Sequence, residues 1–221
     1  MDGAFVADAY LALASALRGL SAARERGDIL MATLVDFSAR AHLFREAQGS
    51  GIGASDQRRA RGLVGILADD PAVVDALVAK HERGLHNLLV ALRAYLDDHA
   101  ALCREVGDLY TAAWLRYQSA GPGTDPCEQL RASAPGTLGA DAREQVCVPS
   151  IAACLLDHEH VYGGCRREAR RRKALVAGAC AGLGPERMHA AAEEWRRTPD
   201  GWREVAGFVL SVAESLGGGA P

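Results

Sequence analysis

The chain has 221 residues, of which 49% are hydrophobic and 24% are charged, and its formal net charge is −3. This length fits one domain or two small ones, and the hydrophobic content is ample for a buried core, which excludes a disordered chain. A slightly negative balance also excludes a basic field over the whole protein, the usual footprint of a dedicated nucleic-acid binder.

The first long helix is expected over about 4–48, and the glycine-rich stretch "GSGIGAS" at 49–55 ends its pattern. We expect no signal peptide, because Asp2 and Asp8 replace a basic n-region. No segment approaches the roughly 20 apolar residues that a membrane span requires. The apolar positions of this helix follow a three-four spacing: Val6, Tyr10, Leu13, Leu17, Leu20, Met31 and Leu34.

The second helix is expected over about 56–118, where a persistent period of about 3.5 residues is typical of a coiled-coil seam. Asp70 and Pro71 match a helix cap and a first helical position, so a new helix starts there or a longer one kinks. The seam contains Leu67, Val74, Val78, His81, Leu85, Leu88, Leu92, Tyr95, His99, Leu102, Val106, Leu109 and Ala113. We assign part of it to the contact of a homodimer, leaving Val74 unassigned: Val78, Leu85, Leu88, Leu92, Tyr95, Leu102, Val106 and Leu109.

The remaining chain predicts a loop at 119–140, rich in Gly, Pro, Ser and Thr, and a third helix at 141–181 that tolerates or bends at Pro149. The stretch "GLGPER" interrupts the helical pattern, and shorter helices are expected at 186–197 and 201–216, before a flexible tail at 217–221. The predicted architecture is all-α: an elongated, antiparallel three-helix coiled-coil bundle with kinked long helices and a short helical tail, forming one domain over 1–216. The pattern alone leaves three folds open: a compact bundle, a spectrin-like repeat and a BAR-type crescent.

The segment "CRREARRRKALVAG", 165–178, concentrates positive charge on one predicted helix face. As a solvated face it would form salt bridges to other helices, and as a functional face it would attract anionic lipid headgroups. A nuclear-localisation signal is disfavoured, because the run lies within a helix. Arg172 falls on the apolar row of that helix. The predicted membrane-binding residues are Arg166, Arg167, Arg170, Arg171, Arg172 and Lys173.

The cysteines and histidines do not form a recognisable metal or catalytic motif. No CxxC pair occurs, so in a reducing compartment we expect buried thiols and no disulfides. "CLLDHEHVYGGC" brings together possible zinc ligands, but the spacing is wide and two of them lie on the apolar row, which favours core residues. "ERMH", with Glu186 and His189, has the Glu-x-x-His spacing of di-iron bundles without a second copy. We expect no cofactor and no enzymatic activity. The cysteines are Cys103, Cys127, Cys147, Cys154, Cys165 and Cys180, and the possible zinc ligands are Cys154, His158, His160 and Cys165.

Three segments, in order along the chain, share features with one family. In "SAARERGDILMATLVDFSARA" the matching residues are Arg24, Glu25, Arg26, Gly27, Asp28, Leu30, Thr33, Asp36 and Phe37. In "HERGLHNLLVALRAY" they are Glu82, Arg83, Leu88, Leu89, Leu92, Arg93 and Tyr95. "MHAAAEEW", 188–195, is the third and weakest match. With these segments the chain resembles the Chibby-interacting BAR-domain family, although Ala91 stands where the family has proline.

The resemblance implies a homodimer that binds anionic membrane and senses or scaffolds curvature. It also implies a cytoplasmic, peripheral-membrane location at the ciliary base, a role in ciliogenesis, and a small Chibby-type coiled-coil partner. We expect no nucleic-acid partner. Two alternatives stay open: a helical adaptor or structural component of a protein assembly that does not bind lipid, and a metal-dependent helical-bundle enzyme.

Overall fold

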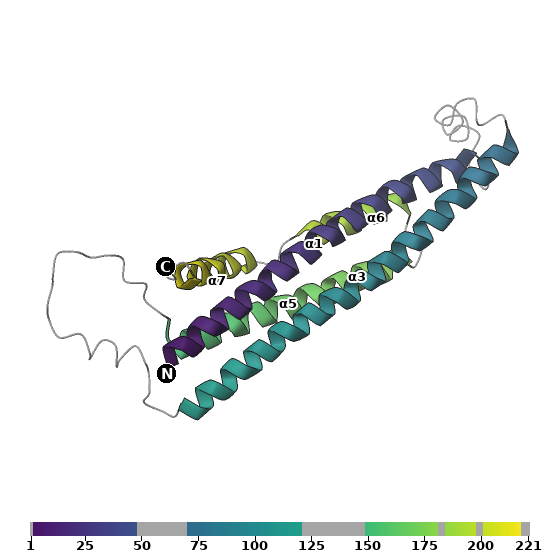
Figure 1. Ribbon diagram of the computed structural model, residues 1–221. Coiled ribbons are helices and arrows are strands. Elements are labelled where there is room, and N and C mark those ends of the chain that lie inside the picture. The colour runs from purple at the N-terminus through teal and green to yellow at the C-terminus, as the bar shows by residue number, and fades with distance from the viewer. Residues whose placement is uncertain (1, 48–69, 121–148, 181–183, 198–200, 218–221) are drawn as a thin grey trace, which may run out of the picture. The chain divides into compact units, whose positions relative to one another are not determined.

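The computed structural model describes residues 2–47, 70–120, 149–180, 184–197 and 201–217, and over these residues the chain is all-α (Figure 1). The all-α class predicted from the sequence is confirmed. The helices of the described residues are α1 (Asp2–Ala47), α3 (Pro71–Ala120), α5 (Ile151–Cys180), α6 (Pro185–Arg196) and α7 (Trp202–Gly217).

Short polar side chains fix where two of the long helices begin. The Asp70 carboxylate accepts hydrogen bonds from the backbone N–H groups of Ala72 at 3.0 Å and Val73 at 3.4 Å, so the predicted cap of α3 is confirmed. The Ser150 hydroxyl accepts a bond of 3.1 Å from the backbone N–H of Ala153 at the start of α5. Pro149 therefore precedes this helix and does not bend it.

Several predicted boundaries fall where the structure gives no description. The end of the first helix at 48, the start of the second at 56–69 and most of the 119–140 loop lie outside the described residues, as do 141–148 and most of the tail. The interruption at "GLGPER" is visible in part, because α5 ends at Cys180 and α6 begins with Pro185 at its first position.

The contacts divide the chain into two compact units, whose boundaries fall inside α1, α3 and α5. One domain over 1–216 stays a prediction. Unit 1 comprises Met1–Ala22, His99–Ala169 and Thr198–Pro221, and unit 2 comprises Ala23–Asp98 and Arg170–Arg197.

The core of unit 1 is built on the apolar row predicted at the start of the chain. α7 joins this core through Val209, and the Trp202 ring lies against the backbone of α5 at Gly164. A Cβ atom at Gly164 would lie 2.5 Å from Cε3 of that ring, so the close approach requires glycine. The core residues are Val6, Tyr10, Leu13, Ala16, Leu17, Leu20, Cys103, Val106, Ile151, Cys154, Val161, Cys165 and Val209.

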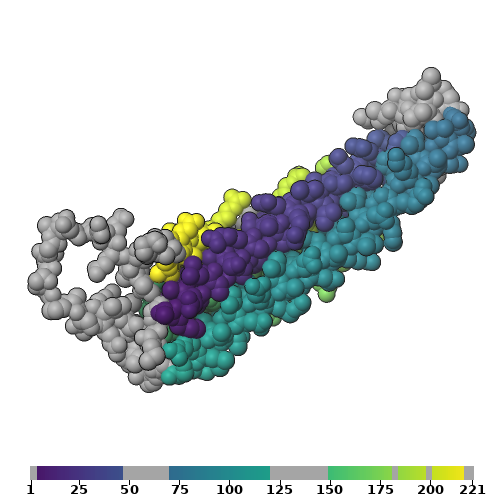
Figure 2. All heavy atoms as spheres, viewed as in Figure 1, coloured from purple at the N-terminus to yellow at the C-terminus, as the bar shows by residue number. Residues whose placement is uncertain are grey.

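In unit 2, α1 and α3 lie side by side, and their side chains are in contact in the space-filling view (Figure 2). The Phe37 ring packs on α3 at Gly84, and Arg45 forms an ion pair of 2.7 Å with Glu82. The buried residues of this unit include Met31, Leu34, Val74, Val78, Leu92, Tyr95, Val176, Met188, Ala192 and Trp195.

By length and composition, α1 could also cross a membrane, which corrects the expectation that no segment could. An 18-residue window within Ala4–Glu46 has a mean hydropathy of 1.2, and 39% of that window is buried inside the chain. The same helix supplies core side chains such as Tyr10 and Leu13, which are fully buried. Its apolar character is thus explained at least as well by packing within the protein.

Candidate functional site

The exposed positive charge of α5 lies on one face of the helix. Arg166, Arg170 and Lys173 are spaced at i, i+4 and i+7, Arg167 lies beside them, and all four are exposed. Glu168, the acid within this run, is only 7% exposed. Its carboxylate is therefore not part of the exposed surface. We call Arg166, Arg167, Arg170 and Lys173 the α5 basic face.

Arg172 does not belong to this face, which corrects its assignment to membrane binding. Its side chain has 0% exposure, so it cannot reach a lipid headgroup. Its guanidinium donates a hydrogen bond to the Tyr95 hydroxyl, lies 3.6 Å from the Asp28 carboxylate and stacks over the Trp195 ring at 4.5 Å. The charge is compensated within unit 2 by a carboxylate and by aromatic faces.

Four helices contribute to the environment of Arg172. Asp28 comes from α1, Tyr95 from α3, Arg172 from α5 and Trp195 from α6, and the Trp195 indole N–H donates a bond of 2.8 Å to Asp28. Gly27 makes room for this group, since a Cβ atom there would lie 2.6 Å from the Tyr95 ring. We call Asp28, Tyr95, Arg172 and Trp195 the Arg172 cluster. The contacts within this cluster connect α6 to α1, α3 and α5 in unit 2.

Arg171 is also engaged within unit 2, at the carboxyl end of α6. Its guanidinium donates hydrogen bonds to the backbone carbonyls of Glu194, Trp195 and Arg197, the last at 2.7 Å. Arg24 donates a further bond of 3.4 Å to the Arg197 carbonyl. Helix ends carry carbonyls without helical partners and a partial negative charge, so both arginines cap α6. The predicted set of six membrane-binding residues is thereby reduced to the four of the α5 basic face.

Half of the predicted dimer seam is already buried within one chain. Leu92 and Val106 have 0% exposure, Tyr95 4% and Val78 8%. A side chain with almost no accessible area has almost none left to bury against a second copy. These four residues are therefore core residues of the chain and not dimer contacts. The others are partly buried, and their role in a dimer stays a prediction: Leu85, Leu88, Leu102 and Leu109.

The residues considered as zinc ligands lie on different sides of α5. His158, Cys154 and Cys165 are buried, whereas His160 is exposed. His158 Nδ1 lies 2.8 Å from the Cys154 carbonyl, and burial lowers the pKa of His158. In the part of the chain that the structure describes, no group of three or more His, Cys, Asp or Glu side chains is arranged to hold a metal ion.

The unit 1 core contains a hydrogen bond between side chains of α1 and α5 that the sequence did not predict. The Tyr10 hydroxyl donates a hydrogen bond of 2.5 Å to the Asp157 carboxylate, joining α1 to α5. Burial, followed by this bond, raises the pKa of Tyr10 far above its usual range. The phenol is therefore a neutral donor at physiological pH.

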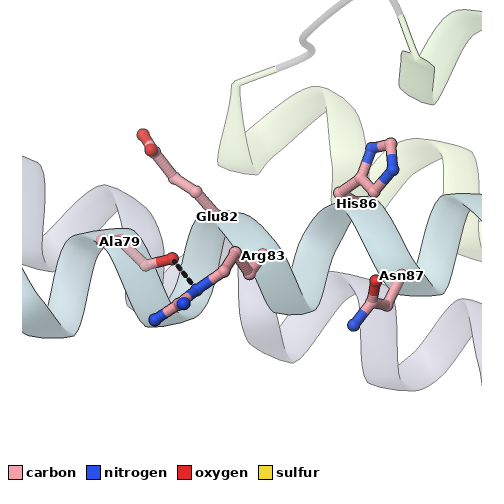
Figure 3. Close-up of a pocket in the computed structure, with 5 residues that line it drawn as sticks. All are labelled: Ala79, Glu82, Arg83, His86 and Asn87. Atoms are coloured by element: carbon pink, nitrogen blue, oxygen red, sulfur yellow. Dashed lines mark hydrogen bonds between the residues drawn. The ribbon is translucent and has the colours of Figure 1, made fainter.

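The surface of α3 has a shallow hollow in unit 2 (Figure 3). The lining residues that the structure describes come from this helix, and the Arg83 guanidinium donates a hydrogen bond of 3.3 Å to the Ala79 carbonyl. Glu82 is engaged by Arg45. No ligand is assigned to this hollow, because its described lining does not form an enclosed apolar pocket. The lining residues are Ala79, Glu82, Arg83, His86 and Asn87.

Comparison of the chain with protein-family models, curated proteins and solved structures finds no match. The resemblance to the Chibby-interacting BAR-domain family therefore stays a prediction. The structure does give a reason for one of its quoted motifs, because Gly27 and Asp28 are both needed at the Arg172 cluster. Gly27 is required there for close packing, and Asp28 is required to compensate the charge of Arg172.

Proposed function

We propose that this protein is a non-enzymatic helical protein that binds anionic membrane through the α5 basic face. The observation that carries the proposal is the presence of four exposed cations on one side of a helix, while the acid within this run, Glu168, is buried. A basic side chain near an anionic bilayer contributes on the order of 1 kcal/mol. The four together would be sufficient for peripheral, reversible attachment.

The proposed form is a BAR-like helical bundle that acts as a homodimer and senses or scaffolds curvature. Dimerisation would present two basic faces to one membrane and raise the apparent affinity without any new contact. Leu85, Leu88, Leu102 and Leu109 remain candidates for the dimer contact. The ciliary-base location, the role in ciliogenesis and the Chibby-type partner are proposals that rest on the resemblance alone.

Co-sedimentation with liposomes tests the membrane proposal. Vesicles of phosphatidylcholine are compared with vesicles that contain increasing phosphatidylserine or phosphoinositide, each at low and at physiological salt. Binding is expected to rise with anionic lipid and to weaken with salt, because the attraction is screened. Equal sedimentation with neutral and anionic vesicles would contradict a charge-based attachment.

A second candidate function is that of a helical adaptor that binds only protein. It is favoured by exposed apolar side chains near the end of α3: Trp114 is 41% exposed, Leu115 60% and Tyr117 44%. Exposed apolar and aromatic groups of this kind often mark protein contacts. If the protein does not co-sediment with anionic vesicles, the adaptor function is the better explanation. Proteins bound by the wild type would then be compared with those bound by Trp114→Ser/Tyr117→Ser, which should lose them.

A further inference from the structure

Two buried cysteines, Cys103 on α3 and Cys165 on α5, lie against each other in unit 1. The Cys103 thiol donates a hydrogen bond to the backbone carbonyl oxygen of Cys165, with its Sγ atom 3.6 Å from that oxygen. Cys103 is 7% exposed and Cys165 is 1% exposed. The two helices approach closely one turn away, where a Cβ atom at Gly107 would lie 2.9 Å from the Tyr162 ring.

The surroundings of the two thiols are unequal. His99 Nδ1 lies 3.6 Å from Cys103 Sγ, one helical turn away on α3. The interaction with Cys165, followed by that with His99, lowers the pKa of Cys103, although burial and the Glu168 carboxylate oppose this; the interaction with Cys103 and burial raise the pKa of Cys165. Cys103 is therefore the thiol that ionises first, and Cys165 keeps its proton.

We propose that Cys103 and Cys165 are an oxidation site that closes reversibly into a disulfide joining α3 to α5. The co-reactant is a small peroxide, which would react first at Cys103, the more exposed of the two thiols. This inference is independent of membrane binding. A structural role for both thiols as small apolar core residues is the alternative that the test must exclude.

The chemistry needs only the two thiols and the peroxide. The Cys103 thiolate attacks one peroxide oxygen, the O–O bond breaks, and the released hydroxide takes up a proton to become water, leaving a sulfenic acid on Cys103. The sulfur of Cys165 then attacks the sulfur of that sulfenic acid, the S–O bond breaks, and the Cys165 proton leaves with the hydroxide as a second water. Two thiols are oxidised to one disulfide while one peroxide is reduced to two waters.

Cys154 provides the matched control. Like Cys165, it is buried on α5. Like Cys103, it lies near a histidine, since its Sγ atom is 3.6 Å from His158 Nδ1. This sulfur contact with His158 lies within its own helix and does not join α5 to α3, and burial, followed by Asp157, raises the pKa of Cys154 to about 12. We expect Cys154 to remain a free thiol where Cys103 and Cys165 react.

The test uses the purified, reduced full-length chain, treated with hydrogen peroxide, blocked with N-ethylmaleimide and mapped by mass spectrometry after proteolysis without reductant. The expected product is a peptide pair linked through Cys103 and Cys165, which dithiothreitol separates. It should form in the wild type and in Cys154→Ser but not in Cys103→Ser or Cys165→Ser. His99→Gln should slow its formation several-fold at neutral pH, because less of Cys103 is then thiolate.

Mapping the wild type decides the matter even if a serine variant fails to fold. Free thiols at both positions, sulfinic acid at Cys103 without a cross-link, or linkage of either cysteine to a different one would overturn the proposal. The cross-link joins positions 62 residues apart, so it should raise the Tm by about 5 to 15 °C. An unchanged or lower Tm of the cross-linked chain would show that the native separation of α3 and α5 does not accommodate the bond.

Discussion

The Asp28 carboxylate and the Trp195 indole are joined by a hydrogen bond of 2.8 Å, although 167 positions separate them in the sequence. Asp28 also lies 3.6 Å from the buried guanidinium of Arg172. One carboxylate on α1 thus holds the aromatic anchor of α6 and balances a charge on α5. The stability of unit 2 should depend on it.

Replacement of Asp28 by asparagine should lower the free energy of unfolding by about 1–3 kcal/mol. The amide still accepts the bond from Trp195, but Arg172 loses its opposite charge. This cost is smaller than that of breaking a fully buried ion pair. The Asp28 side chain is 42% exposed, so water compensates in part for the lost charge. Asp36→Asn is the control, as Asp36 pairs only at the surface, at 3.7 Å from Arg40. Equal urea midpoints for the two variants would contradict a central role for Asp28.

Replacement of Arg172 by lysine should destabilise the protein by about 3 kcal/mol. A lysine ammonium would lack the planar group that stacks over Trp195 and donates to Tyr95, and it would still be buried. Arg170→Lys makes the same chemical change at an exposed position two residues away and should cost less than about 0.5 kcal/mol. Urea unfolding followed by circular dichroism compares the two. Similar losses would mean that the buried guanidinium is not specifically required.

Two glycine-to-alanine substitutions should have opposite effects. In Gly27→Ala the new Cβ atom would lie 2.6 Å from the Tyr95 ring and 3.1 Å from Arg172, so the Arg172 cluster must shift, at a cost of about 1–3 kcal/mol. In Gly163→Ala the nearest atom is the flexible end of Arg167, at 3.4 Å, so the gain in helix propensity should raise stability by about 0.5–1 kcal/mol. Thermal unfolding of both variants checks the sign. A stabilised Gly27→Ala protein would show that the cluster is loosely packed.

Stability should fall as the pH is lowered below about 6.5, through His158. Burial lowers the pKa of His158 in the folded chain, while the unfolded chain keeps the ordinary value near 6.5. Below that pH the unfolded state binds more protons, and the contribution is up to about 1.4 kcal/mol per pH unit. Urea unfolding at pH 7 and at pH 5 should show a smaller pH dependence in His158→Gln than in the wild type. His160→Gln, at an exposed position, should behave like the wild type, and the same pH dependence in both variants would refute the assignment.

Much of the fold follows from local signals that the sequence displays. The helical class, the inward row of Tyr10 and Leu13, the Asp70 cap and the interruption before α6 all depend on residues a few positions apart. The contacts among α1, α3, α5 and α6 depend on which helices become neighbours, and a periodic pattern does not encode that choice. The periodic pattern therefore places Arg172 on the apolar row of α5, but it does not predict the residues that Arg172 contacts.

The candidate site shows the same limit. Helical spacing correctly grouped Arg166, Arg170 and Lys173, because they lie on one face of a single helix. Arg171 was misassigned, because its partners are backbone carbonyls at the end of another helix and carry no sequence signal. The buried part of the seam was misassigned for a related reason, since a period of about 3.5 residues does not distinguish packing within a chain from packing between chains.

The central proposal, that the α5 basic face binds anionic membrane, is tested most directly by charge reversal in liposome co-sedimentation. Arg167→Glu/Arg170→Glu removes two cations from the face and should weaken binding to phosphatidylserine vesicles by at least about 30-fold at low salt. The matched control, Arg26→Glu/Arg187→Glu, makes the same change in net charge at exposed positions outside the face and should bind within about threefold of the wild type. Wild-type binding by the first variant, or equal loss in both, would contradict the proposal.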